Sequence, residues 1–135
     1  MPKVTQLTLR LGSKPGVLAQ IASTLARAGV NITAICAAEA TSGRGKIRLL
    51  VDNPARATEA LKAARFRPGQ EEALALTLDN RPGALAEVAG KLARARVNIK
   101  CAYATTSGSG PALVILSMTN VARAHQVLEE SASTP

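Results

Sequence analysis

The chain has 135 residues, of which 47% are hydrophobic, and it carries a formal net charge of +8. This composition excludes a disordered polar chain, and no run approaches the roughly 20 apolar residues of a membrane-spanning helix. The first residues also lack the apolar segment of a signal peptide, so we expect a cytoplasmic protein.

The excess of basic residues permits an acidic partner, which makes nucleic-acid binding one alternative function. The only aromatic residues, Phe66 and Tyr103, offer few platforms for base stacking, and the basic residues are spread along the chain. Cys36 and Cys101 do not cluster with histidine as a zinc site would require. We therefore expect reduced cysteines, no metal and no cofactor.

The first predicted element is a strand over Val4–Leu11, with its leucines on one face. A turn at Ser13-Lys14-Pro15-Gly16 follows, because proline is well placed just before a helix. The helix itself is predicted from apolar residues at helical spacing, and Gly29 marks its end; the apolar residues are Leu18, Ile21, Leu25 and Ala28.

A second strand follows, and we expect one of its faces to carry Val30, Ile32, Ala34 and Cys36. A turn at 42–45 leads into a third strand over Lys46–Asp52. Asn53 and Pro54 begin a second helix that runs to about Ala64, and a short strand is expected around Phe66. The order strand, helix, strand, strand, helix, strand predicts an α+β, ferredoxin-like βαββαβ unit, an antiparallel sheet with both helices on one face.

The same pattern occurs a second time, 67 residues later and without a gap. Pro15-Gly16-Val17-Leu18-Ala19 recurs as Pro82-Gly83-Ala84-Leu85-Ala86, and Val30-Asn31-Ile32 recurs as Val97-Asn98-Ile99. A duplication of this kind predicts two structural repeats, which we place at 1–70 and 71–135.

The second copy ends differently from the first. After Leu128 the sequence is polar, so the last strand of the second repeat is missing or is supplied by another segment. An uncovered strand edge favours pairing with another chain, and we therefore expect a homodimer.

The run Asp79-Asn80-Arg81-Pro82-Gly83-Ala84-Leu85, followed by Val97-Asn98-Ile99, closely resembles the ACT-domain signature, and the first copy resembles it as well. The resemblance covers about residues 4 to 128. It implies a regulatory protein that binds a small molecule, most often an amino acid, at the interface between paired ACT units. It also implies that the output passes to a partner, for example a metabolic enzyme regulated in trans, or that the protein stores its ligand.

In this family the loop after the first strand and the start of the second strand face the ligand. The resemblance therefore implies a first site with Ser13, Lys14, Pro15, Gly16, Asn31 and Cys36, and a second with Asn80, Arg81, Pro82, Gly83, Asn98 and Tyr103. The chemistry agrees, because a helix N-terminus with glycine accommodates a carboxylate, and an asparagine amide can both donate and accept.

Each of these residues also has a purely structural interpretation. The Pro-Gly pairs can shape the loop, Ser13 and Asn80 can cap a turn, and Asn31 and Asn98 can tie the strand start to neighbouring backbone. Cys36 and Tyr103 can simply pack.

Catalysis is not expected, because the sequence offers no nucleophile with a base, no paired carboxylates and no metal ligands. The main alternative to a sensor is a protein–protein assembly scaffold, and a basic nucleic-acid-binding module is the less favoured one.

Overall fold

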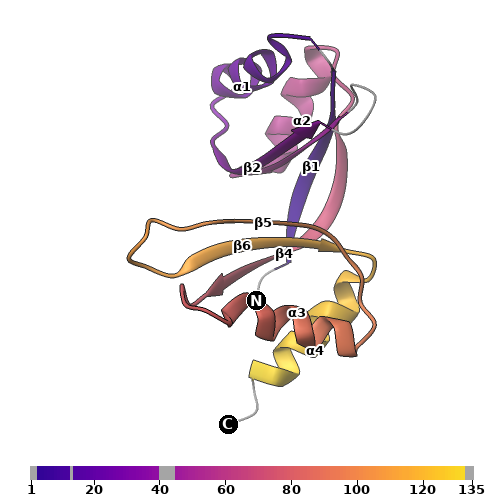
Figure 1. The fold of residues 1–135 in the computed structure, drawn as a ribbon. Helices are drawn as coiled ribbons and strands as arrows, with labels where there is room; N and C mark the ends of the chain where they lie inside the picture. Colours follow the sequence, from indigo (N-terminus) through magenta and orange to yellow (C-terminus); the bar gives the residue numbers. More distant parts are fainter. Residues whose placement is uncertain (1–2, 13, 40–44, 133–135) are drawn as a thin grey trace. The chain divides into compact units, whose positions relative to one another are not determined.

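The computed structural model describes residues 3–12, 14–39 and 45–132 (Figure 1). In chain order its elements are β1 (Lys3–Leu11), α1 (Val17–Arg27), β2 (Ile32–Glu39), β3 (Gly45–Val51), α2 (Pro54–Ala63), β4 (Gly69–Leu78), α3 (Ala84–Arg94), β5 (Ile99–Thr105), β6 (Ala112–Met118) and α4 (Val121–Ala132). The order strand, helix, strand, strand, helix occurs twice, and the predicted α+β fold of two ferredoxin-like repeats is confirmed.

The chain forms two compact units, and the boundary between them runs through two strands. One unit contains residues 5–71; among the described residues, the other contains 3–4 together with 72–132. The start of β4 therefore belongs to the first unit, and the start of β1 belongs to the second.

The expected short strand around Phe66 is wrong. Phe66 lies in the connection after α2, and the next strand begins at Gly69 and continues without a break to Leu78. Pro68 explains the later start, since proline has no N–H to donate to a strand ladder. Residues 69–72, at the expected boundary between the two repeats, are therefore part of β4.

In the unit of residues 5–71, β3 lies between β2 and β1. All three strands are antiparallel, with Leu7 opposite Leu49 and Leu9 opposite Ile47. Helices α1 and α2 cover the face on which these residues lie, and the core consists of Leu7, Leu9, Ile21, Leu25, Val30, Ile47, Leu49, Val51, Ala57 and Leu61.

The unit of residues 72–132 repeats this plan, with β6 between β4 and β5. Leu74 lies opposite Leu116 and Leu76 opposite Val114, and α3 and α4 cover this face. The core consists of Leu74, Leu76, Val88, Leu92, Val97, Val114, Leu116, Met118, Val121, Ala124 and Leu128. In the described part of the chain, no helix combines the length and apolar character that a membrane crossing requires.

The prediction that Val30, Ile32, Ala34 and Cys36 share one face is wrong. A shift in the β2–β3 register lies between Ile32 and Ala34, so that Ile32 pairs with Val51 but Cys36 pairs with Arg48. Such a bulge adds one residue to the strand, so each residue after it lies on the opposite face of the sheet from the one that strict alternation predicts. Ile32 therefore packs against the helices' core, whereas Ala34 and Cys36 lie on the opposite face.

Candidate functional site

A Pro-Gly loop precedes the first helix of each unit. Gly16 and Gly83 have φ angles of 94° and 91°, a left-handed conformation that only glycine adopts at low cost. Among the described residues, neither N-cap position makes a side-chain capping hydrogen bond, because each is a glycine. Because the first N–H groups of a helix have no intrahelical partner, these two helix starts can donate hydrogen bonds to an anion.

The residues beside these glycines are exposed. Lys14 and Pro15 lie before Gly16 in one unit, and Arg81 and Pro82 lie before Gly83 in the other. The structure thus places the predicted loop residues at the surface at the start of each helix. Ser13, which we predicted as a ligand contact, lies outside the described residues, as does most of the turn expected at 42–45.

The two loops differ in charge. Arg81 Nη2 lies 3.1 Å from the Glu87 carboxylate, and its Nε lies 3.5 Å from that of Asp79. The hydrogen bond from Arg81 to Glu87 is the main reason why the pKa of this guanidinium is raised. At the equivalent positions of the first copy, Gly12 and Gln20 replace the two acids, so the loop that contains Lys14 has no such carboxylates.

Asn80 connects the second loop to the β5–β6 hairpin. Its side-chain nitrogen donates to the Thr106 hydroxyl at 3.2 Å and to the Gly108 carbonyl at 3.5 Å. The Thr106 hydroxyl also accepts a hydrogen bond from the Gly108 backbone at 3.1 Å. Asn80 therefore fixes one loop against another and leaves its side-chain oxygen as an acceptor.

Asn31 and Asn98 precede the second strand of each unit, and both residues are exposed. Both residues are held by hydrogen bonds of their backbone atoms. The Asn31 carbonyl accepts from the backbone N–H of Asp52 at 3.1 Å, and the Asn98 carbonyl accepts from the backbone N–H of Thr119 at 3.1 Å. The backbone N–H of Asn31 also donates to the Asp52 carboxylate at 3.0 Å. The side-chain amides are not needed for these ties.

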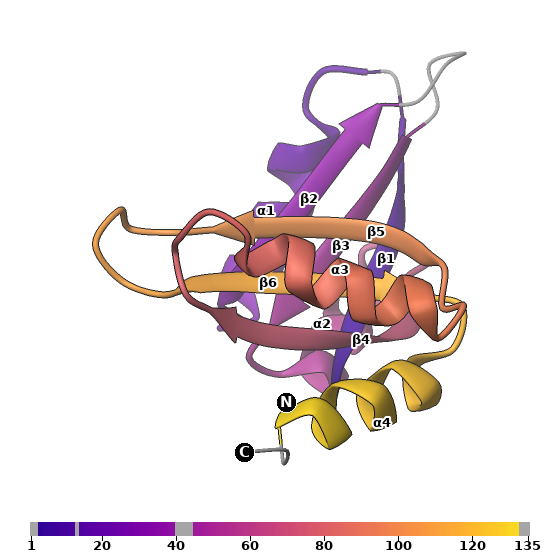
Figure 2. The same cartoon turned by 60° about the horizontal axis from the view of Figure 1, so that its bottom comes forward.

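Within one unit the Pro-Gly loop and the asparagine lie at opposite ends of a helix. Helices α1 and α3 contain 11 residues each, which corresponds to about 16 Å. Figure 2 shows this for α3, whose β4 loop lies at one end and whose connection to β5 lies at the other. A free amino acid is too short to contact both, so a single unit does not bring all of its predicted site residues together.

Cys36 and Tyr103 occupy equivalent positions on β2 and β5, and both are partly buried. Tyr103 pairs with Ile115, as Cys36 pairs with Arg48, on the sheet face away from the helices. Both strands are the outer strands of their units' three-stranded ladders. Cys36 and Cys101 are not joined in a disulfide bond.

Two leucines beside the Pro-Gly loops lie at the surface. Leu18, which the helical spacing groups with the core residues Ile21 and Leu25, is 41% exposed in the first turn of α1, and its repeat equivalent Leu85 is 51% exposed in the first turn of α3. Ile35 on β2 is exposed to a similar extent. The signal was present in the sequence, since a leucine directly after both Pro-Gly loops is as regular as the loops themselves.

The unit of residues 5–71 also contains a charged cluster on its helix-free face. Gln6 and Arg48 donate to one oxygen of Glu71, at 2.8 Å and 3.1 Å respectively. Burial raises the pKa of Glu71, but the two hydrogen bonds and the charges of Lys46 and Arg48 lower it by more, and the net pKa lies below the usual value of 4.5. The described residues contain no group of His, Cys, Asp and Glu suited to a metal ion.

Comparisons with known proteins agree with this architecture. A family model described as an ACT domain pair matches residues 2–133. The crystal structure of protein BT0572 from Bacteroides thetaiotaomicron has a TM-score of 0.89 and 31% identity, over 96% of this chain and 89% of that chain. A sequence comparison with curated proteins found no match.

Two aspartate kinase structures are also similar. The ligand-free regulatory subunit from Thermus thermophilus has a TM-score of 0.67 and 19% identity, covering 93% of this chain and 90% of that chain. Aspartokinase III from E. coli, in complex with lysine and aspartate, has a TM-score of 0.51 and 25% identity. That match covers 95% of this chain and 30% of the E. coli chain.

Proposed function

Because the chain belongs to the ACT domain pair family, we propose that it is a non-catalytic regulatory protein that senses an amino acid. One observation carries this proposal: both units present a Pro-Gly loop whose left-handed glycine begins a helix without a side-chain cap. The Ala84 N–H of α3 donates to the Arg81 carbonyl at 3.3 Å, and the other N–H groups of the first turns suit the ligand's carboxylate, whose negative charge the helix dipole favours.

The ligand group that does not contact the Pro-Gly loop needs a binding residue from a second ACT unit. Since Asn98 lies about one helix length from the Pro-Gly loop of its own unit, we propose that a second copy of the chain completes the site in a homodimer. The amide of Asn98 or Asn31 would then bind the ammonium or carboxylate group that the loop does not reach. The exposed Leu18 and Leu85, beside the loops, suit the ligand's apolar atoms or the partner's surface.

The second unit supports the better site of the two. It has Asn80, held by Thr106 at 3.2 Å, at the position where the first copy has Ser13. Arg81 and its two carboxylate neighbours give this loop both signs of charge, which suits a zwitterion. Asn80, Arg81, Pro82, Gly83 and Asn98 are therefore the proposed primary contacts.

The output of the sensor passes to another protein in this proposal. The fold is shared with the regulatory subunit of an aspartate kinase, so a metabolic enzyme regulated in trans is the proposed partner, and the cytoplasm is the proposed location.

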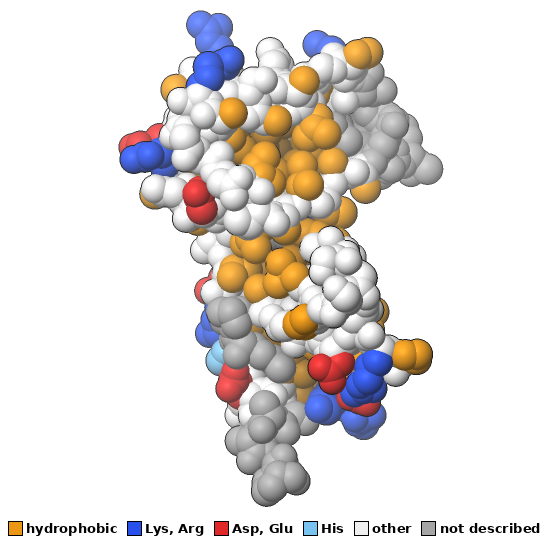
Figure 3. Space-filling model, turned by 90° about the vertical axis from the view of Figure 1, so that its left-hand side faces the viewer, with side chains coloured by type: hydrophobic (Ala, Val, Ile, Leu, Met, Phe, Trp, Pro, Cys, Tyr) orange, Lys and Arg blue, Asp and Glu red, His pale blue; other side chains and the backbone are white. Residues whose placement is uncertain are grey.

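Two alternatives remain. A pure assembly scaffold would associate without responding to any metabolite. A nucleic-acid module would need a continuous basic surface, whereas on the face drawn in Figure 3 the basic side chains lie in several separate places around hydrophobic patches.

The test is a thermal-shift screen of the full chain against the twenty amino acids, beginning with lysine and aspartate, which the E. coli relative holds. A ligand at about 100 times its Kd adds about 2.7 kcal/mol, which raises the Tm by several degrees. We expect a shift with one amino acid or a few related ones, and a dimer by light scattering. A dimer with no shift at millimolar concentrations would support the scaffold instead.

A further inference from the structure

The two copies of the repeat carry a charge of the same sign at only three equivalent positions, and all three are basic. They are Lys14 and Arg81, Arg27 and Arg94, and Arg56 and Arg123. The first pair lies in the Pro-Gly loops. The second pair lies in the last turns of α1 and α3, where the helix dipole favours a cation. Neither the fold nor the proposed site accounts for the third pair.

Arg56 and Arg123 lie where the electrostatics of a helix disfavour a cation. Each is in the first turn of its helix, and its backbone N–H donates to the side chain of the asparagine that precedes the helix, at 3.1 Å for Arg56 and 3.0 Å for Arg123. The start of a helix is the positive end of its dipole and favours acidic side chains. The first turns of α2 and α4 nevertheless contain no acid. The stability of these helices therefore does not explain the two arginines.

The side chain of Arg56 extends to the connection between α1 and β2, which contains Asn31. Its Nη1 atom lies 3.8 Å from the position that a Cβ atom would take at Gly29, two residues before Asn31. The start of α2 is held beside the same connection, because the Asn31 carbonyl accepts from the backbone N–H of Asp52 at 3.1 Å. Arg56 therefore brings a positive charge to the end of the unit at which the proposed ligand-binding asparagine lies.

The charges of these two arginines are not neutralised by ion pairs. In the part of the chain that the structure describes, neither Arg56 nor Arg123 takes part in one. Arg123 Nη1 donates to the amide oxygen of Gln126 at 3.4 Å, and this acceptor is uncharged. Both residues are exposed, so their guanidinium groups can bind an external anion.

The second unit is more basic at this end than the first. Three differences between the copies each make it more positive: Asp52 is replaced by Thr119, Glu59 by Gln126, and Gly29 by Arg96. Arg96 has a φ of 61°, a left-handed conformation that costs an arginine more than a glycine. The unit with the better-equipped Pro-Gly loop is thus also the one with the stronger positive potential beside its asparagine.

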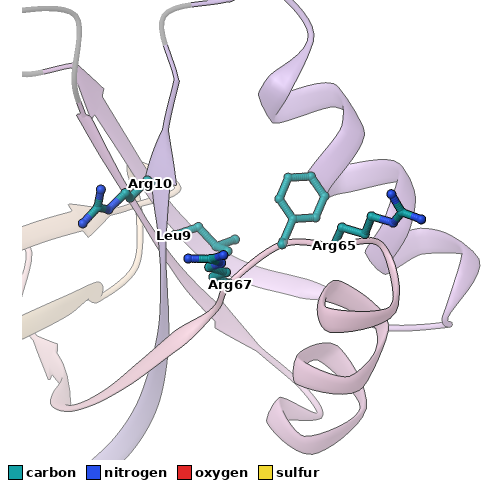
Figure 4. A pocket seen from close by; sticks show the side chains of 5 residues that line it. Leu9, Arg10, Arg65 and Arg67 are labelled. Atoms are coloured by element: carbon teal, nitrogen blue, oxygen red, sulfur yellow. The ribbon is translucent and has the colours of Figure 1, made fainter.

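The other arginines of the first unit do not gather at one place. Figure 4 shows the guanidinium groups of Arg10 and Arg65 pointing in opposite directions, away from the pocket that these residues line together with Leu9. Arg48 is paired with Glu71 at 3.1 Å. Arg56 is therefore the arginine of this unit that is best placed to bind a ligand near Asn31.

We propose that Arg56 and Arg123 are further ligand-binding residues and that they select an amino acid with a side-chain carboxylate. This inference rests on the proposed amino-acid site and extends it. The Pro-Gly loop of one copy holds the α-amino and α-carboxylate groups. The asparagine and the arginine of the facing copy hold the second carboxylate, to which a guanidinium group can donate two parallel hydrogen bonds. The ligand class is therefore the acidic amino acids.

The test is calorimetric titration of the full chain with aspartate and glutamate, and with asparagine and glutamine as matched controls. Each amide has nearly the size of its acid and lacks only the side-chain charge. We expect one of the two acids to bind at least about tenfold more tightly than its amide, because a charge-assisted hydrogen bond is stronger than a neutral one.

The double variant Arg56→Gln/Arg123→Gln changes both units. It should lower the affinity for the acid by about tenfold or more and remove the preference for the acid over its amide. Its Tm without ligand should not fall, since each arginine opposes the dipole of its helix. Arg65→Gln removes the same charge beyond the other end of α2, so it is the control and should bind as wild type does.

The failure of this proposal can be distinguished from the failure of the proposed function. A neutral or basic amino acid that binds while both acids fail would overturn the acidic ligand class and leave the sensor in place. Equal affinity of the acid for wild type and the double variant would remove the two arginines from the site. A lower Tm of the double variant with unchanged affinity would assign them a structural role instead. If none of the twenty amino acids binds, both proposals are wrong.

Discussion

The side-chain nitrogen of Asn80 donates a hydrogen bond of 3.2 Å to the hydroxyl of Thr106, 26 residues later in the chain. This bond joins the loop before α3 to the β5–β6 hairpin. It gives Asn80 a structural role in addition to the proposed role in ligand binding.

The two roles of Asn80 can be separated by comparison with its partner. Thr106→Val removes the hydroxyl, and Asn80→Ala removes the amide; each should cost up to about 1 kcal/mol, since both groups are exposed. If Asn80 also contacts the amino acid, only Asn80→Ala weakens binding beyond the loss seen in Thr106→Val. Equal losses of amino-acid affinity in both variants would show that Asn80 only holds the loop in place and does not contact the ligand.

Asn98→Ala should weaken amino-acid binding without unfolding the protein. The tie to Thr119 uses the backbone carbonyl of Asn98, which the substitution leaves in place. Losing a hydrogen bond to a charged ligand group should cost about 1.5–3 kcal/mol, a factor of ten or more in Kd. The Kd is measured by titrating each variant with the amino acid found in the screen. The Asn31→Ala variant tests the equivalent site of the first copy in the same way. Unchanged affinity in Asn98→Ala would remove this residue from the site.

Gly83→Ala and Gly90→Ala should have opposite effects on stability. Gly83 has a φ of 91°, where an added Cβ is strained by about 1 kcal/mol or more. Gly90 lies inside α3, and its Cβ would meet only the tip of Arg94 at 3.4 Å. Alanine should stabilise that position by up to about 1 kcal/mol. Urea denaturation of both variants measures the difference; a Gly83→Ala variant as stable as wild type would contradict the left-handed start of α3, and destabilisation by Gly90→Ala would contradict the space beside Gly90.

Glu71→Gln should reduce the dependence of stability on acid pH. The pKa of Glu71 is lower in the folded protein than the usual 4.5, so its ionisation stabilises the fold above that pH. This stabilisation is lost as the pH falls from 4.5 through the folded-state pKa. The variant should therefore be less stable than wild type at neutral pH and converge with it in acid. Denaturation curves across this range, with the exposed Glu59→Gln as control, measure the convergence; parallel curves would contradict it.

Leu85→Ala should lower the free energy of unfolding far less than Leu92→Ala, although both leucines belong to the same apolar pattern of α3. Leu92 is fully buried, and truncating such a leucine costs about 2–5 kcal/mol. Leu85 is 51% exposed, so its truncation should cost less than about 1 kcal/mol. Thermal denaturation measures both. If ligand or partner contact is the reason for its exposure, Leu85→Ala should still weaken amino-acid binding or dimerisation.

The sequence by itself determined the repeat, the order of most elements and most of the buried face of the first helix in each unit. These features follow from local patterns that a single sequence contains. They are the alternation of apolar residues in β1, the helical spacing of apolar residues around Leu25 and Leu92, and the two Pro-Gly loops. The duplication strengthened each inference, because an accidental pattern does not recur 67 residues later without a gap.

Only the tertiary structure decided which residues lie together. The bulge after Ile32 moves the later residues of β2 to the opposite faces of the sheet. The alternation of apolar and polar residues in the sequence does not reveal a single extra residue of this kind. Phe66 turns onto the core because of hydrogen bonds at the end of α2, so the strand starts later than composition suggests. The hydrogen bond from Gln6 to Glu71 joins two residues that are 65 positions apart in the sequence. Contacts of this kind depend on how distant segments pack, which no local pattern encodes.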